Sequence, residues 1–199
     1  DGNFCRALME LISKKREVKG QMGTLGGSGL RRLRQWWPRG EALPEPSLMS
    51  AEQSNSSIAI GDKMILKMYR RLHLGCNPDL EASFFLSEEV SFPHVPKLGG
   101  YLEYQAGRHQ LLTFGVLQEG VASEGDAWKL TLDQLVLYYE QVLAQTTHPE
   151  APAVPHHDLV SLAQAEIPDE TKRFLGEYLE TAKLLGQRTV LVGGDHPGH

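Results

Sequence analysis

The strongest constraint on the fold is a pair of apolar runs joined by a two-residue turn. The runs at residues 57–60 and 63–69 flank Gly61 and Asp62. A Gly-Asp pair between two apolar runs is typical of a β-hairpin, because both residues accept the backbone angles of tight turns. The chain is therefore expected to contain antiparallel β-structure.

Further strands and one helix are expected around this hairpin. Residues 95–98 and 101–104 flank a Gly-Gly pair, which predicts a second hairpin, and residues 110–118 form another apolar run. The Asn-Pro-Asp triplet at 77–79 predicts a helix between the hairpins, since it supplies a cap, a first-turn proline and an acid near the positive helix end. The predicted order is hairpin, helix, hairpin, strand.

The first fifty residues have a different pattern. Apolar residues recur at helical spacing over positions 4–12, with Asn3 as the expected cap. The stretch at 23–29 is too rich in glycine for regular structure, and several prolines follow it. Residues 20–50 are therefore expected to form a loosely structured link.

The part that follows Val121 is expected to be helical. Apolar residues lie on one face of a first helix between positions 128 and 143, and on one face of a second helix that starts near Asp169. Together these patterns predict an α+β fold, an antiparallel sheet with a helix followed by a helical segment. The expected divisions are residues 1–50, 51–123 and 124–199.

Composition limits the classes of function. The 199 residues carry a formal net charge of −5, which disfavours a general nucleic-acid binder because such proteins present a dense basic face. No apolar run approaches the ~20 residues of a membrane span, and no secretory signal is visible. Cys5 and Cys76 are far apart and in no metal-binding pattern, which favours free thiols in a reducing cytoplasm.

One local basic stretch contrasts with this negative charge. A solvated helix edge is its favoured interpretation, because charge runs usually stay in water, and an anionic partner is the alternative. The stretch comprises Lys14, Lys15, Arg16 and Lys19, followed by Arg31, Arg32 and Arg34.

Lys67 is the clearest candidate for chemistry. It lies in an apolar strand, where its ammonium group needs a partner because an unpaired buried charge is costly. Glu81 shares a face of the next helix with Phe84 and Phe85 and needs a cation in turn. A strand lysine paired with a helix glutamate is how protein kinases hold nucleotide phosphates. From the pattern alone, a lysine reaching water at a sheet edge and a solvated glutamate explain the residues equally well.

A polar segment at residues 52–57 precedes the first strand of the hairpin. Its small hydroxyl and amide residues can cap a tight turn whose backbone N–H groups face an anion. An ordinary polar turn is the simpler interpretation of the segment alone. The position of the segment favours an anion-binding turn over an ordinary one. The segment leads into the hairpin that presents Lys67, which is where a kinase places its phosphate-covering loop.

Four runs in order carry a family resemblance: EQSNSS at 52–57, ILKMYRR at 65–71, GCNPDLE at 75–81 and GDAW at 125–128. They resemble the maltokinase family, whose members also occur fused to trehalose synthase. The resemblance covers most of residues 51–190 and implies an aminoglycoside-phosphotransferase-like kinase fold. It also implies ATP-dependent phosphorylation of maltose at its anomeric hydroxyl, giving maltose 1-phosphate.

The resemblance implies roles for individual residues. Lys67 would contact the nucleotide phosphates, with Glu81 as its ion-pair partner. Gly120 stands where the family has a larger residue. ATP would also be bound by a phosphate-covering turn, Ser54, Asn55, Ser56 and Ser57, and by a hinge after the last strand, Gln118, Glu119 and Val121.

The half of a kinase site that performs chemistry has no counterpart in this sequence. Phosphoryl transfer needs a positioning residue and carboxylates that hold Mg²⁺. In such kinases a His-Gly-Asp loop and a later aspartate supply them, whereas Gly194, Asp195 and His196 have these residue types in the wrong order. We expect the helical pattern of the C-terminal part to break at Gly193. We also expect this chain to be a fragment of a longer protein and to be inactive by itself. Mg²⁺ and maltose would bind only with a C-terminal lobe.

The alternative function is a non-enzymatic module that contacts a partner such as trehalose synthase. Other motifs are weaker. The glycine-rich stretch lacks the Gly-Lys-Ser/Thr ending of a phosphate loop. His156 and His157 have no obvious third metal ligand, so a loop or a helix start capped by Asp158 explains them better. Packing is favoured over sugar stacking for the tryptophans, Trp36, Trp37 and Trp128.

Overall fold

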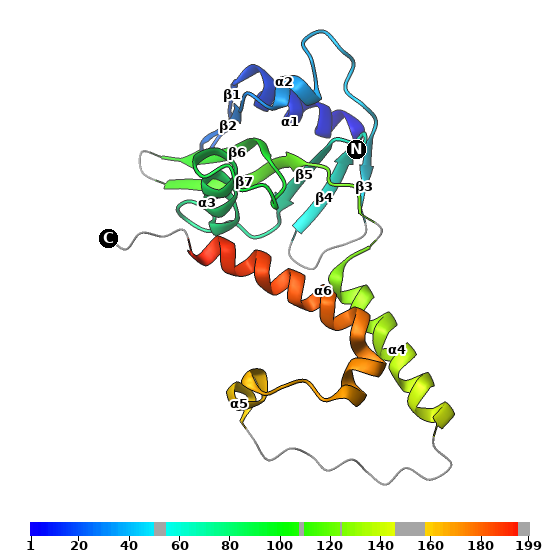
Figure 1. Ribbon diagram of the computed structural model, residues 1–199. Coiled ribbons are helices and arrows are strands. Elements are labelled where there is room, and N and C mark those ends of the chain that lie inside the picture. Colours follow the sequence, from blue (N-terminus) through cyan, green and yellow to red (C-terminus); the bar gives the residue numbers. More distant parts are fainter. Residues whose placement is uncertain (50–54, 108–109, 124, 146–157, 195–199) are drawn as a thin grey trace. The chain divides into compact units, whose positions relative to one another are not determined.

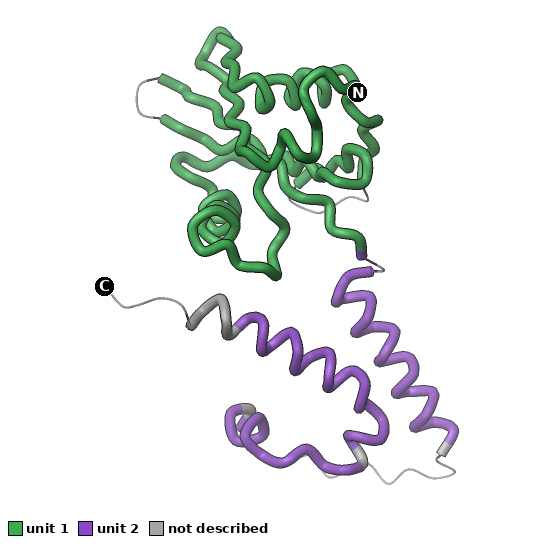
Figure 2. The backbone as a smooth tube through the Cα atoms, turned by 45° about the horizontal axis from the view of Figure 1, so that its top comes forward, with its two compact units in different colours: residues 1–122 green, residues 123–199 purple. Residues whose placement is uncertain are grey.

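The computed structural model describes residues 1–49, 55–107, 110–123, 125–145 and 158–194. It divides into two compact units, residues 1–122 and 123–199 (Figure 2). The elements in chain order are α1 (Gly2–Lys14), β1 (Glu17–Lys19), β2 (Thr24–Gly29), α2 (Leu33–Trp36), β3 (Pro46–Leu48), β4 (Asn55–Ile60), β5 (Met64–Tyr69), α3 (Pro78–Phe84), the π-helix η1 (Phe85–Glu89), β6 (Leu98–Ala106), β7 (Gln110–Glu119), α4 (Ala127–Gln145), α5 (Leu159–Gln164) and α6 (Asp169–Gly194).

A seven-stranded sheet organises the first unit, in the order β1-β2-β6-β7-β5-β4-β3. All its pairings are antiparallel. The predicted hairpin forms between β4 and β5, where Ile60 pairs with Met64 and Gly61 takes a φ of 57° that glycine accepts without strain. The predicted α+β class, an antiparallel sheet with helices followed by a helical segment, is confirmed.

Helices cover both faces of this sheet, with α1 and α2 on one side and α3 on the other (Figure 1). Successive side chains of a strand point to opposite faces, so each strand supplies both layers. The α3 side is built around Tyr69, Leu80, Leu98 and Val116. The α1 side is the larger core and includes Leu8, Met9, Ile12, Ile58, Ile60, Met64, Leu66, Leu102 and Leu117.

The prediction of a loosely structured link over residues 20–50 is wrong. The glycine-rich stretch is strand β2, which pairs with β1 and β6 inside the sheet. Its glycines allow α1 to lie directly on the strand: a Cβ on Gly27 would lie 2.5 Å from the Ile12 backbone nitrogen, and one on Gly29 would lie 2.6 Å from the Ile12 carbonyl oxygen. Close backbone approach therefore explains the composition that had indicated a loop.

The second predicted hairpin is also placed wrongly. Gly99 and Gly100 lie inside the continuous strand β6, next to an irregularity in its pairing with β7. A Cβ on Gly100 would lie 2.6 Å from the Ser28 carbonyl oxygen, so this glycine permits close contact with β2 instead of forming a turn. The second hairpin joins β6 to β7, and the predicted strand at 110–118 is β7.

Local capping signals predict helix starts well, with one exception. The Asn77 side chain accepts a hydrogen bond from the Asp79 backbone N–H at 2.9 Å, as expected for the start of α3. Asp158 caps α5 in the same way. The cap of α1 is Asp1, which accepts from the backbone N–H of Asn3, so the assignment of Asn3 as the cap is wrong.

The second unit is helical, as predicted. Helix α4 packs against α6, with the rings of Tyr138 and Phe174 edge to face at 6.0 Å. Helix α6 begins at Asp169 as expected but runs through Gly193 to Gly194, so the predicted break is wrong. Trp128 is 71% exposed, in contrast to the packing expected for it, whereas Trp36 and Trp37 pack on the α1 core. In the described part of the chain, no helix is long and apolar enough to cross a membrane.

The tight contact between α1 and β2 predicts that alanine substitutions at neighbouring glycines change the free energy of unfolding by different amounts. Gly27→Ala should lower the free energy of unfolding by about 1–3 kcal/mol, because the new methyl group displaces the helix backbone. Gly26→Ala is the matched control, since its Cβ would meet Glu17 Cγ at an ordinary 3.5 Å. Urea denaturation of both variants measures the difference. Equal stability of the two variants would contradict the packing described.

Candidate functional site

Lys67 lies in the middle of the sheet. Its strand β5 runs between β4 and β7, and Lys67 pairs with Ser57 on one side and Val116 on the other. Its side chain points to the face covered by α3, as do those of Tyr69 and Val116. The Lys67 side chain is 21% exposed, so its charge lies in a largely dehydrated position that still reaches solvent.

The carboxylate of Asp79 holds the Lys67 ammonium group in place. Lys67 Nζ donates to Asp79 Oδ2 at 3.0 Å, and the Tyr69 hydroxyl donates to the same oxygen at 2.9 Å. Asp79 is the second residue of α3, at a helix start fixed by the Asn77 cap. One carboxylate oxygen therefore joins two side chains of β5 to the first turn of the helix.

The expected Lys67–Glu81 ion pair is replaced by the Lys67–Asp79 pair. Glu81 is exposed to solvent one half-turn further along α3. Residues two positions apart on a helix point in nearly opposite directions, so Asp79 and Glu81 cannot both face Lys67. The side chain nearer to the helix start is the one that faces the strand.

Tyr69 completes this cluster as a neutral hydrogen-bond donor. Burial, reinforced by the hydrogen bond to Asp79 and by the negative charge of Asp79, raises the pKa of Tyr69 far above its ordinary value. The phenol therefore keeps its proton at every physiological pH. It can restrain the Asp79 carboxylate without adding a charge to the site.

Glu81 belongs to a different, acidic neighbourhood near Cys76. Partial burial, followed by the negative charges of Glu81 and Glu103, raises the pKa of the Cys76 thiol. Burial also raises the pKa of Glu103. The thiol is therefore largely protonated at neutral pH and is a weak nucleophile. No group of three or more His, Cys, Asp or Glu residues could hold a metal ion among the residues that the structure describes.

The polar segment before Lys67 is a strand where the structure describes it. Asn55, Ser56 and Ser57 open β4 and pair with Tyr69, Met68 and Lys67, so the prediction that these three form a turn is wrong. Alternation places Asn55 and Ser57 on the same face as Lys67, and Ser56 on the other. Ser54 lies outside the described residues.

The predicted hinge follows directly from β7. Gln118 and Glu119 are its last residues. The Glu119 backbone N–H donates to the Lys97 carbonyl at 2.8 Å, and the Glu119 carboxylate accepts from the Lys97 backbone N–H at 3.1 Å. These bonds fix the end of the strand, whereas Val121 is 59% exposed.

Gly120 lies where there is little room for a side chain. Its backbone N–H donates to the Lys63 carbonyl at 2.8 Å, at the start of β5. A Cβ on Gly120 would lie only 3.0 Å from the Asp62 carbonyl oxygen. A larger residue at this position would push the two segments apart.

The structure thus places Lys67, Asn55 and Ser57 on one face of the sheet and excludes Glu81 from the ion pair. Sequence analysis missed Asp79 and Tyr69 as partners of Lys67. The position of Tyr69 two residues after Lys67 placed both on one strand face, which was a usable signal. The sequence pattern explains Asp79 only as a favourable residue for the helix start.

No protein-family model matches the chain. One similar solved structure is described as "Glucosamine kinase (crystal form B)", with a TM-score of 0.36 and 14% sequence identity. The match covers 74% of this chain and 44% of that protein, so this chain spans less than half of its length.

The assignment of the ion pair can be tested with two isosteric variants. Asp79→Asn should lower the free energy of unfolding by about 1–2 kcal/mol, because it removes the charged acceptor shared by Lys67 and Tyr69. Glu81→Gln should change it by less than about 0.5 kcal/mol, as is usual for exposed positions. Denaturant unfolding at pH 7 measures both. A larger loss of stability in Glu81→Gln than in Asp79→Asn would show that α3 turns Glu81, and not Asp79, toward β5.

The pKa of Tyr69 predicts a stability change at alkaline pH. The neutral phenol is favoured in the fold, so its contribution is complete below the unfolded tyrosine pKa of about 10 and is lost as the pH rises further. Tyr69→Phe should therefore lose less stability than the wild type between pH 8.5 and about 11, measured by urea denaturation. Tyr139→Phe, at a residue 60% exposed, is the control and should follow the wild type. An identical pH dependence for Tyr69→Phe would refute the assignment.

Proposed function

We propose that this chain is the ATP-binding part of a sugar kinase of the maltokinase type. The observation that carries the proposal is the position of Lys67, a strand lysine held by a carboxylate of the adjoining helix and partly open to solvent. Protein kinases hold nucleotide phosphates with a strand lysine oriented in this way. The four sequence runs that resemble maltokinases include Lys67 and Asp79, which support the same function.

In this proposal Lys67 contacts the ATP phosphates and Asp79 has the orienting role that was expected of Glu81. Asn55 lies on the same sheet face, where its polar side chain would adjoin the phosphates, whereas Ser57 on that face is buried and would contribute to the shape of the site. Ser54, which lies outside the described residues, remains a proposed member of the phosphate-covering segment, whereas Ser56 lies on the other face of the sheet from Lys67. The adenine would be bound by backbone groups at the end of β7, with Gln118, Glu119 and Val121 as the hinge.

The residues that the structure describes do not fit a magnesium site by themselves. Asp79 already accepts from Lys67 and Tyr69, and the described residues contain no cluster suited to a metal ion. We therefore propose that Mg²⁺, the acceptor maltose and the residue that positions its hydroxyl belong to a second lobe of a longer protein. Formation of maltose 1-phosphate is proposed for that protein, and this chain alone should not catalyse it.

Nucleotide binding by the isolated chain tests the proposal. Lys67→Ala should weaken ATP binding at least tenfold, about 1.4 kcal/mol, measured by isothermal titration calorimetry. Lys63→Ala is the matched control, since Lys63 is an exposed lysine on the same hairpin and should leave the affinity unchanged.

Two results would contradict this function. An unchanged ATP affinity in Lys67→Ala, with a wild-type melting temperature, would exclude the phosphate contact. Absence of ATP binding by the folded wild-type chain would favour the non-enzymatic module, whose proposed partner is trehalose synthase.

A further inference from the structure

A second candidate site lies on the opposite side of the sheet from Lys67. A cavity of about 660 Å³ is bounded by the end of α1, the connection from β2 into α2, and the segment after α2. Its volume is within the range of small-molecule sites, which is roughly 300–1,000 Å³. Nothing in the proposed kinase function uses this cavity.

The lining of the cavity is strongly basic. Two acids, Glu10 and Glu41, accompany six basic residues, in a chain whose formal net charge is −5. The solvated-edge interpretation of the basic stretch thus misses that the fold gathers residues far apart in sequence around one concave surface. The six basic residues are Lys14, Lys15, Arg16, Arg31, Arg34 and Arg39.

Among the residues that the structure describes, most of this positive charge has no carboxylate partner. Lys14 donates to Glu10 at 2.6 Å, which neutralises one pair. Within the described ranges, no acidic side chain forms an ion pair with any of the other five basic residues of the lining. Nearby cations repel one another, and the repulsion is relieved when an anion binds between them.

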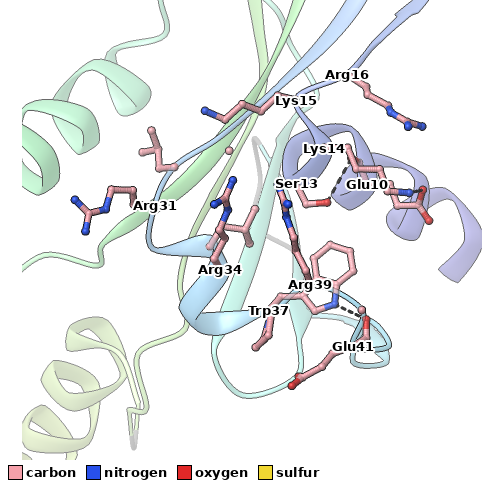
Figure 3. Close-up of a pocket in the computed structure, with 15 residues that line it drawn as sticks. Glu10, Ser13, Lys14, Lys15, Arg16, Arg31, Arg34, Trp37, Arg39 and Glu41 are labelled. Carbon is pink, nitrogen blue, oxygen red and sulfur yellow. Dashed lines mark hydrogen bonds and ion pairs between the residues drawn. The ribbon is translucent and has the colours of Figure 1, made fainter.

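The basic side chains that line the cavity point in different directions (Figure 3). Those of Arg34 and Arg39 point the same way, toward the side of the cavity where Lys15 lies, whereas Arg16 and Arg31 point outward on opposite sides. Guanidinium groups present several N–H donors in a plane that matches two oxygens of a phosphate. Arg34 and Arg39, with Lys15, are therefore the residues best placed to bind one anionic group.

An aromatic wall adjoins these cations. Trp37 lines the cavity together with Leu33 and Pro38, and its indole is held by a hydrogen bond of 3.0 Å from Nε1 to the Glu41 carbonyl. A fixed indole face suits the apolar face of a sugar or a base. Cations beside an indole face match a small ligand in which a phosphate group is attached to a ring.

We propose that this cavity is a binding site for a small phosphorylated ligand. Arg34 and Arg39 bind the phosphate, Lys15 adds a third positive charge, and Trp37 contacts the attached ring. The site is independent of Lys67, because it lies on the α1 side of the sheet and shares none of the residues of the proposed ATP site.

Calorimetric titration with inorganic pyrophosphate and with glucose 6-phosphate tests the site. Both probes should bind with one-to-one stoichiometry, and their affinity should fall as salt increases. The double variant Arg34→Gln/Arg39→Gln should bind each at least tenfold more weakly, while Trp37→Ala should weaken only glucose 6-phosphate. Arg34 and Arg39 are exposed, so the double variant should melt at the wild-type temperature.

Two control variants test whether the loss of binding is specific to the cavity. Arg6→Gln/Arg188→Gln removes two exposed arginines outside the cavity and should leave both affinities unchanged. Lys67→Ala should also bind both probes normally, which separates this site from the proposed ATP site. Saturable binding lost only in Arg34→Gln/Arg39→Gln would support the proposal.

Other outcomes overturn the proposal. No saturable binding of either probe, or equal weakening in both arginine double variants, would show a merely basic surface. Weakening in Lys67→Ala alone would place the phosphate on the other face of the sheet. Binding of poly-glutamate without binding of the phosphorylated probes would identify the cavity as a protein-docking surface.

Discussion

The close contact between α1 and β2 determines the shape of the first unit. Gly27 and Gly29 bring the strand against the backbone of the helix, at a separation that no side chain would allow. This contact places the helix over the larger core and fills the face of the sheet opposite α3. It also brings the basic end of α1 next to the segment that leaves β2, so the cavity depends on the same two glycines.

The two faces of the sheet present different kinds of side chain, because side chains alternate along each strand. Leu66 faces the α1 core, while its neighbour Lys67 faces α3 and Asp79. An ammonium group at this depth is stable because a carboxylate compensates its charge, and the Tyr69 phenol satisfies the same oxygen. The cluster joins β5 to α3 and restrains Lys67 in one orientation.

Local patterns predicted several elements correctly. The Gly-Asp turn predicted the β4–β5 hairpin, and the Asn-Pro-Asp triplet predicted the start of α3, because turns and caps depend on residues close together in the chain. The same reasoning was wrong for glycine. At Gly27 and Gly100 the absent side chain serves contacts with Ile12 and Ser28, which are distant in sequence.

The amino-acid sequence by itself determined the α+β class, the main hairpin and the need of Lys67 for a charged partner, since each follows from short-range spacing or from the cost of burying a charge. Tertiary structure decided which acid meets that lysine, because the rotation of α3 against β5 presents Asp79 and turns Glu81 toward solvent. It also decided that scattered basic residues line one cavity. Such contacts depend on the packing of whole elements, which residue spacing along the chain does not encode.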